Sequence, residues 1–251
     1  IRDPERSRGL GDVYKRQFMD YKVDIVMCID ITGSMQDCID TVKNRALQFW
    51  PDLEEALSAA SKNVSDVRVK VIGFRDFEAD GNGALEISRY FNLSDQGSSD
   101  PEDYKAFVNG LVADGGGDEP ENSLEALALA IQSDWVQTGD KRRHVIVMFT
   151  DASAHKLEDA NRSNPDYPEG MPESFEELTD VWMTPSSGQQ GGTKTKLKQP
   201  AKRLIVFAPE VYPWPELYES WDQVVYNPSK AGTGLDDVSY EDIINAIVGS
   251  V

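Results

Sequence analysis

The chain has 251 residues, and its 25 lysines and arginines against 44 aspartates and glutamates give a formal net charge of −19. This acidic balance, with a sequence pI near 4.4, argues against binding to the phosphate backbone of nucleic acids. The apolar runs are far shorter than the roughly 18 residues of a membrane-spanning helix, and the 39% hydrophobic content suffices for one packed domain.

Residues 1–18, IRDPERSRGLGDVYKRQF, show no helical or strand periodicity and no apolar segment of a secretory signal. The run SRGLGDVYKRQ resembles the translated sequencing-adaptor read-through found at the ends of metagenomic gene models. We therefore expect residues 1–18 to be a non-native, disordered leader and residues 19–251 to form a single domain. Two cysteines, Cys28 and Cys38, are too few for a disulfide framework, which fits a reducing, cytoplasmic location.

The first half of this domain alternates strand patterns with helix patterns. Val23–Ile29 is a near-continuous apolar run of the kind that is buried on both faces of a parallel sheet. Apolar residues then recur every three or four positions from residue 35 to residue 60, which predicts a helix that Pro51 kinks or divides near Trp50. Val67–Phe74 is predicted as the next strand and Glu86–Leu93 as an edge strand.

The second half continues the alternation. Further elements are predicted from their periodicity and start signals: helices at Tyr104–Val112, Glu121–Ile131 and Ile243–Val248, and strands at Arg143–Phe149, Leu204–Ala208 and Val224–Tyr226. Residues 156–200 read as a loop-rich insertion with a short helix after Ser174, and Gly188–Thr195 is expected to be its most mobile part. Such alternation predicts an α/β protein whose parallel-rich sheet carries helices on both faces.

Polar side chains follow two of the buried strands. The segment Asp30-Ile31-Thr32-Gly33-Ser34 comes directly after the first strand, and in an extended turn residues 30, 32 and 34 point the same way. Thr150-Asp151 ends a later apolar strand in the same manner, and ligands of open α/β sheets bind outside the carboxyl ends of strands. If these strands are neighbours, the carboxylates and hydroxyls converge on a site that suits Mg²⁺ or Mn²⁺ better than Zn²⁺.

Each fragment also has a purely local interpretation. Asp30 or Ser34 can be a helix N-cap, and Asp151 can be a turn former. A third fragment, Asp114–Asn122 (DGGGDEPEN), has three glycines that allow the backbone to approach a ligand closely. Its Asp118 is either a metal ligand or the cap of the helix that follows.

Taken together, these motifs resemble those of von Willebrand factor type A (VWA) domains. Asp30–Ser34 is similar to the D-x-[ST]-x-S opening of their metal-ion-dependent adhesion site, or MIDAS. The blocks at Gly73–Asp76, Gly115–Asn122 and Phe149–His155 resemble the VWA domains of the alpha-kinase VWKA group and of related stand-alone bacterial proteins. The resemblance spans roughly residues 21–251 and includes no kinase motif.

The resemblance implies a Rossmann-like, doubly wound, mostly parallel six-stranded sheet with helices on both faces. It also implies a metal site with Asp30, Thr32 and Ser34 in its first loop, Asp118 in or beside its second and Asp151 in its third. The cofactor would be Mg²⁺, or alternatively Mn²⁺ or Ca²⁺, with one position open for an acidic side chain of a protein partner. The expected function is a non-enzymatic, metal-dependent protein-interaction module.

Two other functions remain open. One is a Mg²⁺-dependent phosphohydrolase of the haloacid dehalogenase type, whose D-x-D-x-T pattern has an aspartate where this chain has Thr32, so that the general acid is missing. The other is a VWA scaffold whose metal site is idle. A phosphatase assay and the effect of Mg²⁺ on thermal stability separate the three functions.

The charge of Asp118 leads to a prediction, because many VWA domains have threonine at this position. Asp30 and Asp151 together balance a divalent ion, and Asp118 as a third carboxylate leaves one excess negative charge that holds the ion more tightly. We predict that Asp118→Thr weakens Mg²⁺ binding, as measured by titration calorimetry. Unchanged or tighter binding would remove Asp118 from the ligand set and leave it as a helix cap.

Overall fold

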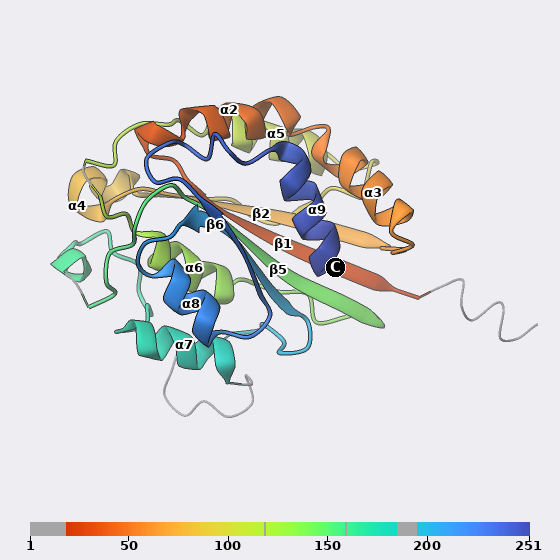
Figure 1. Ribbon diagram of the computed structural model, residues 1–251. Coiled ribbons are helices and arrows are strands. Elements are labelled where there is room, and N and C mark those ends of the chain that lie inside the picture. Colours follow the sequence, from red (N-terminus) through yellow and green to blue (C-terminus); the bar gives the residue numbers. More distant parts are fainter. Residues whose placement is uncertain (1–18, 118, 159, 185–194) are drawn as a thin grey trace, which may run out of the picture.

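A seven-stranded, mostly parallel sheet runs through the centre of the molecule, as the computed structural model shows (Figure 1). Residues 19–117, 119–158, 160–184 and 195–251 are described. The expected leader, Asp118 and nearly all of the Gly188–Thr195 loop therefore lie outside the described residues. The strands are ordered β3-β2-β1-β5-β6-β7, and β4 also pairs with β2.

The parallel part of the sheet is built from five strands that occur at the predicted places: β1 (Tyr21–Asp30), β2 (Asp66–Phe74), β5 (Lys141–Phe149), β6 (Lys202–Pro209) and β7 (Val224–Ser229). β1 lies between β2 and β5 and is parallel to both. This arrangement confirms the Rossmann-like α/β class and brings the carboxyl ends of the five strands to one edge of the sheet.

The prediction of six strands is wrong by one, because the expected edge strand Glu86–Leu93 is two short ones. β3 (Leu85–Ile87) and β4 (Phe91–Asn92) both pair antiparallel with β2. Between them, the backbone N–H of Val71 in β2 donates to the Ser88 hydroxyl at 2.8 Å rather than to a strand carbonyl. A side chain thus takes a ladder position and interrupts the strand.

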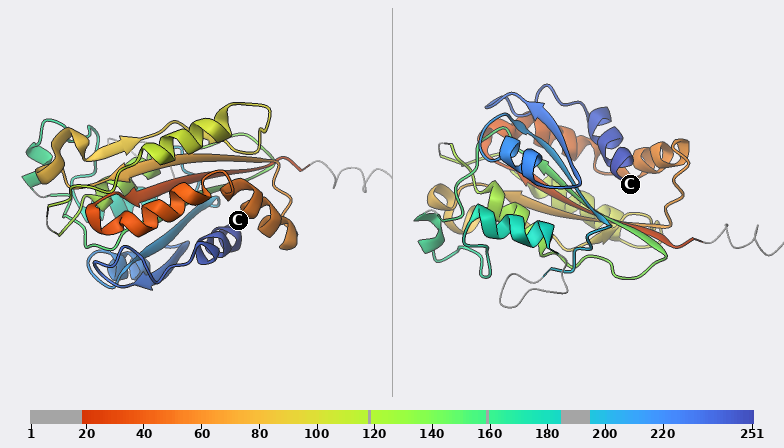
Figure 2. Two further views of the ribbon diagram at one scale, coloured as in Figure 1. Left: turned by 90° about the horizontal axis from the view of Figure 1, so that it is seen from above. Right: turned by 60° about the horizontal axis from the view of Figure 1, so that its bottom comes forward.

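Helices cover both faces of the sheet (Figure 1). One face carries α2 (Gln36–Arg45), α3 (Phe49–Ala59), α5 (Asp100–Gly110) and α9 (Tyr240–Ser250), and the other carries α6 (Ser123–Ile131), α7 (Phe175–Met183) and α8 (Trp214–Ser220). Figure 2 shows α2 between α5 and α9 in the view from above, and α7 and α8 in front in the other view. The short α4 (Phe77–Asp80) follows β2.

Two hydrophobic cores lie on the two faces of the sheet, and β1 contributes to both. Ile25, Met27 and Ile29 pack in the core beneath α2, α3, α5 and α9, whereas Val26 and Cys28 pack in the core shared with α6, α7 and α8. Among the described residues, no helix is long and apolar enough to cross a membrane. Because β1 is buried on both faces, its carboxyl end is held firmly, and the site described below begins there.

The helix ends follow the local chemistry closely. α9 begins with a capping box, in which Ser239 and Asp242 are bonded reciprocally. The predicted division of the first helix near Trp50 is confirmed, because α2 ends at Arg45 and α3 begins at Phe49. Pro51 therefore lies in the first turn of α3, where its missing N–H has no intrahelical acceptor to lose.

Positive side chains gather at the amino ends of the strands. Lys141 has its pKa lowered by burial and by three nearby cations, Arg143, Lys62 and Arg203. The Lys62 ammonium donates to the Val248 carbonyl in the last turns of α9. Lys62 therefore lies at the negative end of the α9 helix dipole, which stabilises both its charge and the helix.

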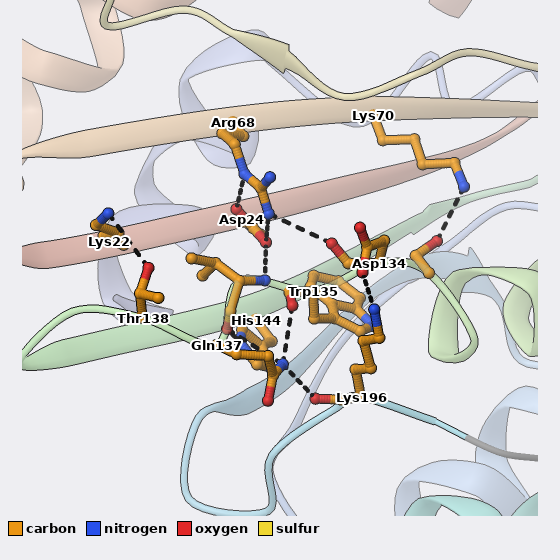
Figure 3. Close-up of polar contacts among 12 residues, drawn as sticks. Lys22, Asp24, Arg68, Lys70, Asp134, Trp135, Gln137, Thr138, His144 and Lys196 are labelled. Atoms are coloured by element: carbon orange, nitrogen blue, oxygen red, sulfur yellow. Dashed lines mark hydrogen bonds and ion pairs between the residues drawn. The ribbon is translucent and has the colours of Figure 1, made fainter.

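Two buried polar groups also lie at this end of the sheet (Figure 3). The Asp24 carboxylate accepts hydrogen bonds from Arg68 Nε at 2.8 Å, Arg68 Nη2 at 2.6 Å and the Val136 amide at 2.6 Å. The His144 ring is stacked on Trp135 with 5.0 Å between ring centroids. Both groups are satisfied within the protein, as burial requires.

His144 is held in its neutral form by the hydrogen bonds around it. Its Nδ1 accepts from the Lys198 amide at 3.2 Å, so Nε2 carries the proton and donates to the Val136 carbonyl at 2.9 Å. Burial is the main cause that lowers the His144 pKa to about 4, and nearby Arg142 and Lys198 lower it further. A second proton on Nδ1 would face the Lys198 N–H and break that bond.

We predict that His144 makes the folded state less stable as the pH falls from about 6.5 to about 4, with a slope of at most about 1.4 kcal/mol per pH unit. In this window the unfolded chain binds a proton at His144 that the folded chain excludes, so unfolding is favoured; above it the contribution is constant. Urea titrations of the wild type and His144→Gln at several pH values measure the slope. Identical slopes for both proteins would contradict the prediction.

Candidate metal centre

The neighbouring strands β1 and β5 bring the predicted ligands together. Asp30 is the last residue of β1, and Asp151 is the second residue after β5. The two strands are paired in parallel from Tyr21 to Ile29, so both aspartates emerge at the same edge of the sheet. Asp30 is completely buried and Asp151 nearly so, at 0% and 1% exposure.

Two hydroxyls connect the two carboxylates. Thr32 Oγ1 donates to Asp30 Oδ1 at 2.6 Å, and Ser34 Oγ donates to Asp151 Oδ1 at 3.0 Å. The two hydroxyl oxygens are 3.4 Å apart. Four of the five residues predicted to bind metal therefore lie in one group, while Asp118 lies outside the described residues.

The remaining carboxylate oxygens have partners that the sequence analysis did not identify. Thr150 Oγ1 donates to Asp30 Oδ2 at 2.8 Å, and the Gly234 amide donates to Asp151 Oδ2 at 2.8 Å. The contact of Thr150 could have been suspected from the sequence, since this residue directly precedes Asp151 at a strand end. The contact of Gly234 could not, because this residue lies 83 positions from Asp151 in the sequence.

The electrostatics of the site oppose the accumulation of negative charge. Burial is the main cause that raises the pKa of Asp30 to about 6; the hydrogen bonds from Thr32 and Thr150 oppose this rise, and the charge of Asp151 contributes to it. A divalent cation between Asp30 and Asp151 would remove this repulsion and compensate for the lost hydration.

Glu121 is a further acidic residue at the site, which the sequence analysis treated only as part of a helix start. Its Oε2 has no hydrogen-bond partner among the described residues, although the residue is 5% exposed. Burial is the main cause that raises its pKa to about 9, and the negative charges of Asp30 and Asp76 contribute to the rise. Its backbone bonds to Ser153 and His155 place it beside the loop that carries Asp151.

Two glycines allow the loops to pack this closely. Gly116 has φ +90°, and a Cβ atom there would lie 2.5 Å from Thr32 Cγ2. Gly234 has φ +62°, and its Cβ would lie 2.3 Å from the Ser34 carbonyl oxygen. Any larger residue at Gly116 or Gly234 would push its own loop away from the Asp30–Ser34 loop.

The donor set decides which ions the site could hold. Asp30 and Asp151 supply carboxylate oxygens, and Thr32 and Ser34 supply hydroxyl oxygens, so all donors are hard. No group of three or more His, Cys, Asp or Glu side chains placed to bind a metal occurs in the described part of the chain. Such a mixed, carboxylate-poor set fits Mg²⁺ or Mn²⁺, which keep several water ligands, and does not fit a structural zinc site.

Residues 94–164 match the family model described as von Willebrand factor A domain. This segment contains residues 114–117, which we call the glycine block, together with β5 and Asp151. Together with the sheet topology, the match supports a VWA-like domain. No curated protein matches the whole sequence significantly.

Solved structures with a similar fold include the pilus adhesin SpaC of Lactobacillus rhamnosus GG, at 12% identity and a TM-score of 0.50 over 91% of this chain. Proximal thread matrix protein 1 of the mussel byssus aligns over 92% of this chain at 14% identity, with a TM-score of 0.44. The chain spans only 30% of the adhesin and 48% of the byssus protein. At these identities the first likeness concerns the fold alone, and the second adds no weight.

We predict that Asp30→Asn stabilises the metal-free protein at pH 7 by about 1 kcal/mol, because it removes a buried charge and keeps the side-chain shape. Thermal or urea unfolding in EDTA measures the effect. Asp24→Asn is the matched control: that carboxylate is equally buried but is paired with Arg68, so its loss should destabilise the protein. A destabilised Asp30→Asn would show that its charge is already compensated without metal.

Proposed function

We propose that this chain is a non-enzymatic, metal-dependent protein-interaction module of the VWA type. The observation that carries the proposal is the convergence of Asp30, Thr32, Ser34 and Asp151 at the carboxyl edge of the sheet. Buried carboxylates without a cation partner are costly, and their retention here is explained if they hold an ion.

The proposed ligands are Asp30, Thr32, Ser34 and Asp151, with Asp118 as an additional candidate from the sequence. The ion would be Mg²⁺, Mn²⁺ or Ca²⁺, and when bound it would offer a positive, incompletely coordinated point at the surface. Hydroxyl ligands neutralise none of its charge. Thr32 is buried, whereas Ser34 is exposed, so Ser34 marks the side from which a partner group would approach.

The proposed partner is a protein, and the family resemblance suggests that one of its acidic side chains completes the metal shell. The loops at the carboxyl edge would form the contact, together with exposed parts of the 155–201 segment. Long loops carried on a rigid sheet commonly provide such surfaces. An ionised Asp118 beside the ion would work against an acidic group, whereas Glu121, with its pKa raised to about 9, carries no charge at pH 7 and does not repel it.

The residue two positions after Asp30 argues against the phosphohydrolase. That enzyme class needs an aspartate there as the general acid, and this chain has Thr32. The Thr32 hydroxyl donates to Asp30 Oδ1 at 2.6 Å and cannot supply a carboxylic acid proton. The remaining alternative is a scaffold with an idle metal site, which experiment must distinguish from the metal-dependent module.

We predict that Mg²⁺ or Mn²⁺ raises the unfolding temperature of the wild type and leaves that of Asp151→Asn unchanged. A ligand that binds only the folded state stabilises it by about 2.7 kcal/mol at one hundred times its Kd. Differential scanning calorimetry with the ion and with EDTA measures the shift. The control Glu54→Gln changes an exposed residue on α3 and should respond to the ions like the wild type. If neither ion changes the unfolding temperature of the wild type, the scaffold with an idle metal site is favoured.

The interaction itself is tested by pull-down from the source lysate in Mg²⁺ and in EDTA. A partner retained by the wild type only in Mg²⁺, and lost with Asp30→Ala, supports the proposal. A phosphatase assay with Mg²⁺ completes the test. Turnover that Asp30→Asn abolishes would establish the enzyme instead.

A further inference from the structure

Arg75 occupies an unusual position between the loops of the metal centre. It directly follows β2, and only 8% of its surface is exposed. Among the described residues, its side chain makes one ion pair, with Glu86 Oε1 at 3.2 Å. Its other hydrogen bonds within this part of the chain go to backbone carbonyls of three separate segments.

Four carbonyls accept from the Arg75 guanidinium. Nε donates to Asp114 at 2.8 Å and to Ile31 at 3.2 Å. Nη2 donates to Val112 at 2.7 Å, and Nη1 donates to Gly83 at 2.6 Å. The planar fork thus joins the first metal loop, the entry to the glycine block and the turn after α4.

Two of these carbonyls belong directly to the metal centre. Ile31 lies between Asp30 and Thr32, so the orientation of its peptide fixes the turn that aims both side chains. Asp114 opens the glycine block, and its amide donates to the same Ile31 carbonyl at 3.1 Å. Two residues later, Gly116 packs against Thr32 and donates to Asp80 Oδ2 at 2.9 Å.

We propose that Arg75 is a positioning residue that sets the distance and orientation of the glycine block relative to the Asp30–Ser34 loop, and thereby the affinity of the metal site. This inference rests on the proposed metal function. Lysine cannot replace Arg75 here, because an ammonium has three donors on a single nitrogen, whereas the three guanidinium nitrogens of Arg75 together reach four carbonyls and the Glu86 carboxylate.

The test compares Arg75, which follows the carboxyl end of β2, with Arg68, which lies near the amino end of that strand (Figure 3). Arg68 binds Asp24 and the Asp134 carbonyl, far from the metal centre along β2. Arg75→Lys and Arg75→Gln are measured beside Arg68→Lys and Arg68→Gln for unfolding temperature and for Mn²⁺ affinity by calorimetry. The lysine variants keep the positive charge and are therefore expected to fold even if the glutamine variants do not.

We expect Arg75→Lys to weaken Mn²⁺ binding about tenfold or more, and Arg68→Lys to leave it within about twofold at a comparable loss of unfolding temperature. If both lysine variants weaken Mn²⁺ binding equally, Arg75 only stabilises the fold in general and the proposal is refuted. Unchanged affinity in Arg75→Lys would also overturn the proposal.

Hydrogen exchange of the metal-free protein separates this inference from the proposed function. Arg75→Lys should accelerate exchange at the amides of Thr32, Asp114 and Gly116, which are bonded within the site. Arg68→Lys should instead accelerate exchange at Val136. If the wild type binds no Mn²⁺, the metal function fails while localised exchange still supports the positioning role; exchange unchanged at the three site amides would refute that role.

Discussion

The parallel pairing of β1 with β5 is the contact on which the candidate site depends. Their register brings Asp30 and Asp151 to one edge of the sheet although they are far apart in the sequence. β1 is buried on both faces by two separate hydrophobic cores, so its end cannot shift without disturbing both. The rigid sheet fixes the carboxylates, and the loops supply the hydroxyls and amides that orient them.

The two ends of the same sheet treat buried carboxylates differently. At the amino end, Asp24 receives a two-pronged ion pair from Arg68 and is neutralised within the protein. At the carboxyl end, the donors to Asp30 and Asp151 within the described part of the chain are all neutral: three hydroxyls and the backbone amides of Thr32 and Gly234. The first arrangement is complete in itself, whereas the second leaves uncompensated charge. That contrast within one domain is the strongest physical reason to assign a ligand to the second.

Much of the fold and part of the candidate site could be predicted from local sequence patterns, whereas the rest depends on tertiary contacts. That Asp30, Thr32 and Ser34 point the same way could be predicted, because alternate residues of an extended turn share one side. That Asp151 lies near them could be predicted because it follows an apolar strand. Arg75 and Gly234 could not be assigned a role, since their partners are separated from them by dozens of residues. Glu86–Leu93 was misjudged because a serine hydroxyl replaced a ladder bond, which no alternation pattern records.

The gathering of Lys62, Lys141, Arg143 and Arg203 opposite the acidic edge has a consequence for the whole molecule. Although the net charge is −19, these cations and the carboxylates of the candidate site lie at opposite ends of the strands. Such a separation of charge favours one orientation of the protein at a charged surface. An immobilised cationic matrix would hold the site-bearing end and hide it, whereas an anionic one would leave that end facing the solution.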